Sequence, residues 1–210
     1  MPLPIPPVER EKFHTRSIRC EGYARADGLW DIEAHMTDVK SYVFRNSWRG
    51  EIPVGEPIHE MWLRLTVDDR MEIRDVEAVT DNSPFEMCPR ITPNFKRLIG
   101  LRIGPGWNRK VKELLGGVQG CTHLTELLGP LATVAFQTIN TGARPRRDAR
   151  FGLANPEHTS ADDRPASPAI LDTCHAWARE SEVVREFMPE HYVAPGTRGN
   201  AQDRPKGDGA

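Results

Sequence analysis

The chain has 210 residues, of which 28 are basic and 30 acidic, and its formal net charge is -2. This length predicts a domain with a well-buried core, and the balanced charge argues against nucleic acid or an anionic membrane surface as a partner. No apolar run approaches the ~20 residues that a membrane-spanning helix needs. We therefore expect the partner to be a small molecule or another protein, with no nucleic acid and no membrane, and the sequence leaves the oligomeric state undetermined.

The two ends of the chain differ in composition from its middle. Residues 1–12 are rich in proline and lack the order of a secretory signal, so we expect them to be disordered. A single domain is predicted over 13–194, with a flexible loop at about 142–168 and a disordered tail over 195–210. Cysteines this widely spread are typical of a cytoplasmic protein with reduced thiols. They are Cys20, Cys88, Cys121 and Cys174.

Alternating side chains in the first part of the chain predict strands. The predicted strands cover 16–25, 29–42, 58–67 and 71–79. A long, exposed connection is expected between the second and the third. Strands that follow one another directly in sequence favour a meander or a related antiparallel sheet.

Helical spacing begins after the fourth predicted strand. Short helices are expected at 93–99 and 107–115, and the longest at 122–139, where apolar residues recur at the helical period. Gly129 and Pro130 are expected to kink or split that helix, and order returns over 170–179. The sequence thus predicts an α+β fold, an antiparallel sheet of about four or more strands with helices packed on one face.

Two imidazoles are candidates for a general base, because histidine titrates near neutrality. His59 begins an otherwise apolar row of its strand, and His123 lies in the Gly120 to Leu124 stretch at the start of the longest helix. Asp31 and Glu33 share a polar strand face and can orient a histidine or supply an acid. The alternatives are core histidines with satisfied nitrogens and carboxylates that are simply solvated.

Other side chains offer contacts for a substrate. Arg25 and Arg64 can bind a phenolate or carboxylate through the guanidinium fork, or can form structural ion pairs with nearby carboxylates. Trp30 and Trp107 can line a pocket for a planar ligand or belong to the core. Cys121 can join the site as a binding group or nucleophile, although residues two apart on a helix do not face each other unless the helix begins after His123.

A metal site is the competing interpretation of the same stretch. Thiolate and imidazole are suitable ligands for zinc or iron, but the paired spacing of structural zinc sites is lacking. The nucleotide-binding glycine motifs and the serine-hydrolase elbow are also missing from the sequence, so the leading expectation has no cofactor and no metal. Cys121 and His123 would need further ligands from a set that comprises His59, Cys88, Cys174 and His175.

Several motifs in order resemble the bacterial domain-of-unknown-function family DUF2889. They are RCEGY at 19–23, DGLWDIE at 27–33, GEPIHEM at 55–61, RLTVD at 64–68 and GCTHL at 120–124. The resemblance covers about 16–177, and Glu60 stands where an aspartate is more usual in the family. It implies an origin in bacteria that degrade aromatic compounds, and a relation to formaldehyde-releasing lyases that act on lignin-derived aromatic dimers.

The leading hypothesis combines the resemblance with the candidate residues. It is a cofactor-independent lyase that removes a hydroxymethyl group from a phenolic substrate as formaldehyde, with His59 or His123 as the base and Asp31 or Glu33 orienting it. The substrate would be bound by Arg25, Trp30, Arg64, Trp107 and Cys121. The alternatives are a metal-dependent enzyme with a Cys/His site and a non-catalytic binding or assembly protein.

Overall fold

The computed structural model describes residues 3–140, 143–153 and 170–195. These residues divide between two compact units, Met1–Pro156 and Glu157–Ala210. The domain predicted over 13–194 therefore extends over both units, and the sheet belongs to the first. Residues 3–12 contain no helix or strand, and the expected tail from 196 onward lies outside the described residues.

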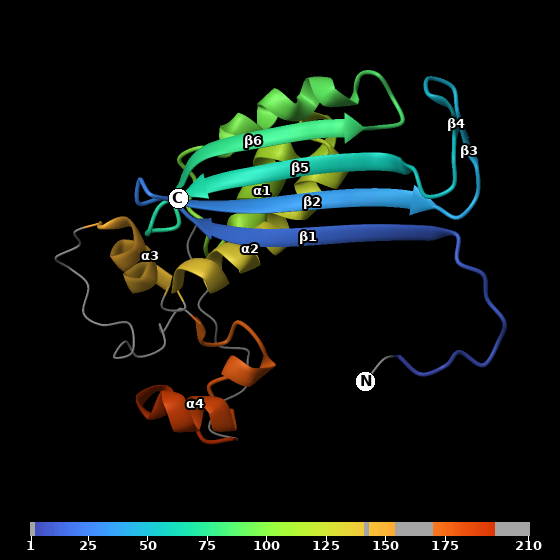
Figure 1. Cartoon of the computed structure of the whole chain (residues 1–210). Helices are drawn as coiled ribbons and strands as arrows, with labels where there is room; N and C mark the ends of the chain where they lie inside the picture. The colour runs from blue at the N-terminus through green and yellow to red at the C-terminus, as the bar shows by residue number, and fades with distance from the viewer. Residues whose placement is uncertain (1–2, 141–142, 154–169, 196–210) are drawn as a thin grey trace. The chain divides into compact units, whose positions relative to one another are not determined.

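The first unit is built on a four-stranded antiparallel sheet with the strand order β1-β2-β5-β6 (Figure 1). A separate two-stranded hairpin, β3-β4, extends the connection between β2 and β5. The α+β prediction is thereby confirmed. The strands are β1 (His14–Ala24), β2 (Trp30–Lys40), β3 (Phe44–Asn46), β4 (Gly50–Ile52), β5 (Pro57–Val67) and β6 (Ile73–Asn82).

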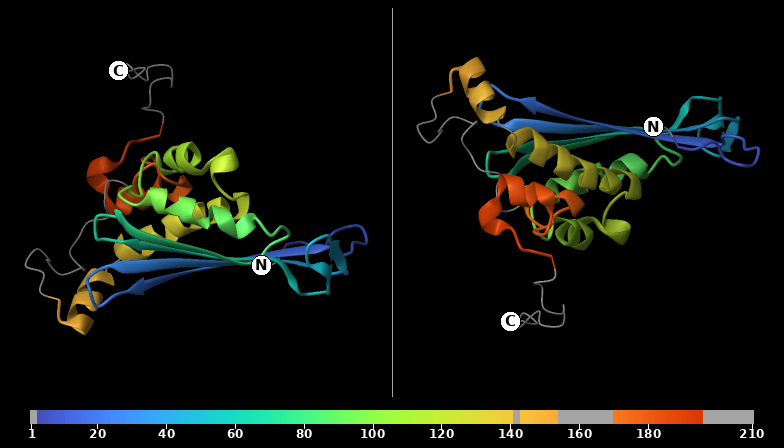
Figure 2. Two further views of the ribbon diagram at one scale, coloured as in Figure 1. Left: turned by 90° about the horizontal axis from the view of Figure 1, so that it is seen from above. Right: turned by 90° about the horizontal axis from the view of Figure 1, so that it is seen from below.

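Most helical segments of the first unit cover one face of the sheet, and Figure 2 shows the green and yellow helices on the same side of it, whereas the orange helix near residue 147 lies at the end of the strands. α2 packs across β1, β2 and β5, and η1 packs on β6. The helical segments are the 3-10 helices η1 (Cys88–Leu98) and η2 (Gly117–Gln119) and the α-helices α1 (Trp107–Leu115), α2 (Thr122–Asn140) and α3 (Ala143–Phe151). No helix in the described ranges has the length and apolar content needed to cross a bilayer.

The core forms between the sheet and α2. Alternate residues of β2, from Trp30 to Met36, are almost fully buried, because successive strand side chains point to opposite faces. α2 contributes leucines at helical spacing, among them Leu124, Leu127 and Leu131, each at 0% exposure. The two periodicities read from the sequence meet in this interface, which fixes the position of the start of α2 relative to the ends of the strands.

Two predicted features of the first unit are refined by the structure. The long, exposed connection after β2 contains two further short strands, since it folds back as the β3-β4 hairpin, in which Asn46 pairs with Gly50. α2 is not split at Pro130, which lies inside the helix. Because residue 129 is glycine, the ring of Pro130 meets no Cβ at the preceding residue.

The predicted loop at 142–168 is wrong at its beginning, because α3 occupies Ala143–Phe151. Its Arg147 side chain is 3% exposed and forms an ion pair with Asp69 at 2.8 Å. That buried contact is a tertiary interaction invisible in the local arginine-rich sequence, and it anchors the helix to the sheet. Most of the remaining loop prediction, over 154–168, falls outside the described residues.

The second unit is described over residues 170–195. Its short helices are η5 (His175–Trp177), α4 (Glu182–Phe187) and η6 (Pro189–His191), and they enclose a small cluster of Leu171, Val184 and Met188. The side chain of Ser181 accepts a hydrogen bond from the Val184 amide at 3.1 Å, which caps the start of α4. The order expected over 170–179 is thus found in this unit.

Candidate active site

A buried carboxylate ends the core row of β2. Asp38 is 1% exposed and follows Met36 on the face of the sheet that α2 covers. The register places Arg16 of β1 opposite Asp38 on one side and His59 of β5 on the other. Three neighbouring strands therefore bring an arginine, an aspartate and a histidine side by side.

Both oxygens of Asp38 accept hydrogen bonds. Arg16 donates from Nε to Oδ1 at 2.8 Å and from Nη2 to Oδ2 at 2.7 Å. His14 Nε2 lies 3.0 Å from Oδ1 and His59 Nδ1 lies 3.0 Å from Oδ2. Burial raises the pKa of Asp38, but the hydrogen bonds and positive charge of Arg16 outweigh it, so the pKa lies below its ordinary value and the carboxylate is ionised.

The contact with Asp38 fixes the tautomer of His59. An ionised carboxylate only accepts hydrogen bonds, so Nδ1 of His59 carries the proton and Nε2 keeps a free lone pair. Burial, and next the neighbouring His123, lower the pKa of His59 to about 4 against the opposing effect of Asp38. The imidazole is thus neutral at pH 7 and able to accept a proton.

The start of α2 brings a second imidazole to the same carboxylate. The His123 ring stacks on the His59 ring with 3.9 Å between centroids and 29° between planes, and its Nε2 lies 3.9 Å from Asp38 Oδ2. Burial lowers the pKa of His123, with Arg16 acting in the same direction. Two neutral imidazoles therefore lie in contact beside an ionised carboxylate.

Cys121 completes this group. Its Sγ lies 4.0 Å from Nδ1 of His123, although the two residues are only two apart in sequence. Because α2 begins at Thr122, Cys121 lies outside the helix and its side chain can turn back toward His123. We call the set the Asp38 cluster, and it consists of His14, Arg16, Asp38, His59, Cys121 and His123.

Arg16 also connects the cluster to the helix. Besides holding Asp38, it forms an ion pair with Glu126, one turn after His123 on α2. The guanidinium of Arg16 thus links the first turns of α2 to β1 and β2. This link keeps His123, at the start of α2, close to His59. Its contacts with two carboxylates raise the pKa of Arg16 further, chiefly through the hydrogen bonds to Asp38.

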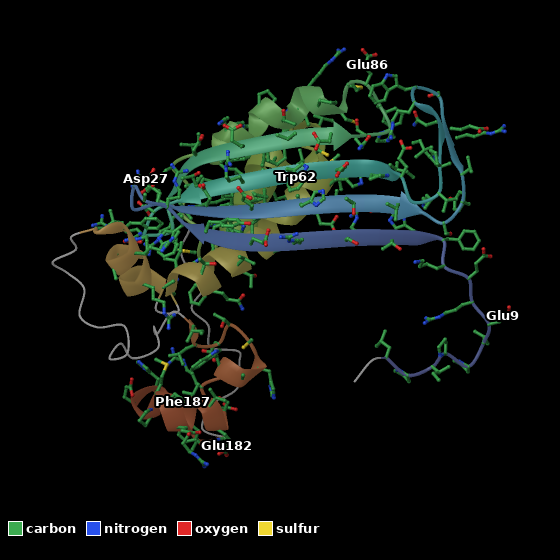
Figure 3. The ribbon with its side chains drawn as sticks, viewed as in Figure 1. Glu9, Asp27, Trp62, Glu86, Glu182 and Phe187 are labelled. Carbon is green, nitrogen blue, oxygen red and sulfur yellow. The ribbon has the colours of Figure 1, made fainter. Side chains whose placement is uncertain are left out.

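The carboxylate that contacts His59 is Asp38, and the prediction that Asp31 or Glu33 would orient the histidine was wrong. Asp31 and Glu33 lie on the opposite face of β2, where Asp31 accepts from Thr66 at 2.7 Å and Glu33 from Arg64 at 3.4 Å. Figure 3 marks this open face by Trp62, which is 41% exposed. The strand period of two separates these acids from the helix-covered face, and Asp38 takes the place assigned to them.

The predicted substrate-binding residues are dispersed. Arg25 pairs with Asp27 and Asp31 near the turn into β2, and Arg64 pairs with Glu33, so the ion-pair alternative is confirmed for both. Of the five predicted binding residues, Cys121 alone belongs to the Asp38 cluster.

Both tryptophans named as binding residues belong to the core. Trp30 Nε1 donates to Asp69 at 2.8 Å, and Trp107 Nε1 donates to the Leu128 carbonyl at 3.1 Å. Each indole proton is therefore satisfied within the fold. Trp30 begins β2, eight residues before Asp38, and Trp107 begins α1, and neither belongs to the Asp38 cluster.

Within the described residues, the group of three or more residues whose ligand atoms lie close enough to share a metal ion belongs to the Asp38 cluster. Asp38, His59 and His123 each offer an atom within 4.8 Å of the others. Of the partners predicted for Cys121 and His123, His59 is therefore near, whereas Cys88 begins η1. Cys174 and His175 belong to the second unit.

Sequence analysis missed Asp38, Arg16 and His14. A signal existed, because Asp38 continues the alternate apolar row that runs from Trp30 to Met36, and an acid in such a row needs a partner when buried. Arg16, the partner of Asp38 on β1, could be identified only from the pairing register of β1 and β2.

The fold and site define an α+β protein in which a buried aspartate joins an arginine to a pair of stacked imidazoles. The family model described as "Protein of unknown function (DUF2889)" matches residues 14–137, and the chain belongs to this family. The matched region contains the whole Asp38 cluster and ends before the expected limit near residue 177. No curated protein and no solved structure matches the chain.

Proposed function

We propose that the chain is an enzyme in which His59, oriented by Asp38, acts as a general base. The observation that carries this proposal is the 3.0 Å contact between His59 Nδ1 and Asp38 Oδ2. It leaves Nε2 as the proton acceptor of a neutral imidazole, which is the protonation state that a base needs at pH 7. All four cysteines are free thiols, which supports a reducing, cytoplasmic location for this chemistry.

Asp38 and Arg16 have separate roles in this arrangement. When His59 takes a proton, the resulting imidazolium is stabilised by the adjacent carboxylate, as in other histidine and aspartate pairs. Arg16 keeps Asp38 ionised, so the carboxylate does not take the proton itself. Burial of the His59 ring, the largest cause of its lowered pKa, disfavours a lasting positive charge there, which helps the base to release the proton at the end of the reaction.

The substrate class follows from the family resemblance given in the sequence analysis. We assign the base to a lyase reaction on a lignin-derived phenolic compound that carries a hydroxymethyl group. The base removes the hydroxyl proton, the carbon–carbon bond to the hydroxymethyl carbon breaks, and formaldehyde leaves. The electron pair stays on the neighbouring carbon and is delocalised into the phenol-derived ring. That carbon then takes up the proton held by His59, which gives the neutral product and restores the base.

The test is formaldehyde release from a phenolic dimer with a hydroxymethyl side chain. In His59→Gln we expect turnover to fall by about 10²–10⁴-fold, the usual contribution of a general base. The matched control is His35→Gln, since His35 stacks on Trp62 on the open face at 3.7 Å between centroids and should leave turnover unchanged. Full activity in a folded His59→Gln protein would contradict the proposed role.

A metal-dependent enzyme is the second candidate, favoured by the spacing of ligand atoms in Asp38, His59 and His123. Against it, Arg16 donates to both Asp38 oxygens, so a cation would have to displace a guanidinium and approach its positive charge. Elemental analysis of protein purified without chelators separates the two. One equivalent of zinc or iron, lost in His123→Ala, would establish the metal site. A co-purifying protein with no response to phenolic dimers would favour a binding or assembly protein.

A further inference from the structure

A hollow in the surface lies far from the Asp38 cluster. It has a volume of about 330 Å³ and is lined by the end of β1, the beginning of β2, the last turns of α2 and α3. Trp30, which lines it, and Asp38 lie on the same strand about 27 Å apart at the rise of an extended chain. The volume falls at the lower end of the range for small-molecule sites. We call this hollow the α3 cavity.

The charge of the α3 cavity is positive. Arg146, Arg147 and Arg150 recur on one face of α3 and all line the cavity, whereas none of its nine lining residues is acidic. Arg147 is compensated, because it pairs with Asp69 at 2.8 Å and with Asp148 at 2.7 Å. Arg146 and Arg150 are exposed and have no ion-pair partner among residues 3–140, 143–153 and 170–195. Both guanidinium groups therefore add positive charge to the lining of the cavity.

The rest of the lining is apolar and aromatic. The buried ring of Trp30 lies under the Arg147 guanidinium, 4.9 Å from its carbon. Phe151 is the last residue of α3, and the guanidinium carbon of Arg150 lies 5.9 Å from the centre of its ring. Apolar walls with a few convergent charged groups are the usual composition of a small-molecule site. Because Trp30 is 1% exposed, it forms the floor of the cavity beneath Arg147, and the aromatic surface open to a ligand is that of Phe151, which is 36% exposed. A flat ring can lie against Phe151 while an attached anionic group meets the two arginines.

We propose that the α3 cavity binds a small aromatic carboxylate, whose negative charge is held by Arg146 and Arg150. Like charges four residues apart on a helix repel each other, and a bound carboxylate relieves this repulsion while it accepts charge-assisted hydrogen bonds. The site is separate from the proposed base, and both arginines lie beyond the 14–137 region that the family model matches. It is therefore a property of this chain that the family assignment does not supply.

The experiment is calorimetric titration of the full chain with benzoate, inorganic phosphate and benzyl alcohol. Benzoate combines the ring and the charge, so it should bind at least about tenfold more tightly than either of the other two. Equal binding of phosphate and benzoate would overturn the assignment of an aromatic ligand, and failure of benzoate to bind would overturn the site.

Paired variants locate the binding. Replacing Arg146 and Arg150 together by alanine should weaken benzoate binding by about tenfold for each guanidinium removed. The control replaces Arg45 and Arg109, which are 86% and 78% exposed, and removes the same charge without effect on binding. Unchanged affinity in the Arg146 and Arg150 variant would refute the proposal. Retained benzoate binding in His59→Gln would show that the two sites are independent.

Discussion

The depressed pKa of His59 makes the stability of the fold depend on pH in a defined window. His59 titrates at about 4 in the folded chain, against an ordinary value of 6.5. Below pH 6.5 the unfolded chain therefore binds a proton at His59 that the folded chain does not, and acidification favours unfolding. The stability linked to His59 is complete above pH 6.5 and is lost as the pH falls toward 4.

The magnitude follows from the two pKa values. Each pH unit inside the window changes the free energy of unfolding by about 1.4 kcal/mol, so the full effect is about 3 kcal/mol. Between pH 8 and pH 5 the loss should be about 2 kcal/mol by the same relation. The His59 side chain is 16% exposed, so solvent screening should reduce this figure little. The lowered pKa of His123 acts in the same direction.

Urea unfolding at pH 8 and pH 5 measures the effect. Between pH 8 and pH 5, the loss of unfolding free energy should be about 2 kcal/mol smaller in His59→Gln than in the unaltered chain. His35→Gln serves as the control and should keep the full pH dependence, since it leaves His59 and its neighbours in place. An identical pH dependence in His59→Gln and the unaltered chain would refute the assignment of a buried, neutral imidazole.

Two further substitutions test the packing around the site and the sheet, each by urea unfolding at pH 7. Asp38→Asn should lose about 1–3 kcal/mol, because an uncharged amide replaces the carboxylate that accepts from Arg16 and His59, while Arg16 keeps its ion pair with Glu126, whereas Glu33→Gln on the open face should change stability by less than about 0.5 kcal/mol. Gly22→Ala should cost about 1–3 kcal/mol, since the new Cβ would lie 2.1 Å from Thr138 Oγ1, and adding Thr138→Ala should restore part of the loss, because the Cβ of residue 138, 2.9 Å from the new Cβ, remains. Gly104→Ala, where no atom lies within 4 Å of the new Cβ, should be neutral.

Much of the sheet was predictable because its strands follow one another in sequence and alternate cleanly. The buried face of β2, from Trp30 to Met36, was assigned correctly, as was the leucine stripe of α2. The departures arose from tertiary contacts. α3 forms around an arginine that pairs with Asp69, a residue 78 positions earlier in the chain, and no local pattern reports such a contact.

The candidate site was only partly predictable, for a similar reason. His59 and His123 were both selected, and the structure places their rings in contact, but their shared carboxylate was sought on the wrong face of β2. Counting by twos from Trp30 places Asp38 on the core face and Asp31 on the other. What the sequence could not supply was the pairing of β1 with β2, which brings Arg16 opposite Asp38.

The Asp38 cluster is costly for the fold that contains it. An apolar residue at position 38 would continue the core row of β2 without desolvating a charge, and well-packed apolar replacements of buried ion pairs are often neutral or stabilising. Instead, polar side chains from β1, β5 and the start of α2 converge on one carboxylate of β2, and two of them are imidazoles with depressed pKa values. Local rules of core composition are broken most often where a protein functions. The break at Asp38 therefore supports a catalytic rather than a structural reason for the cluster.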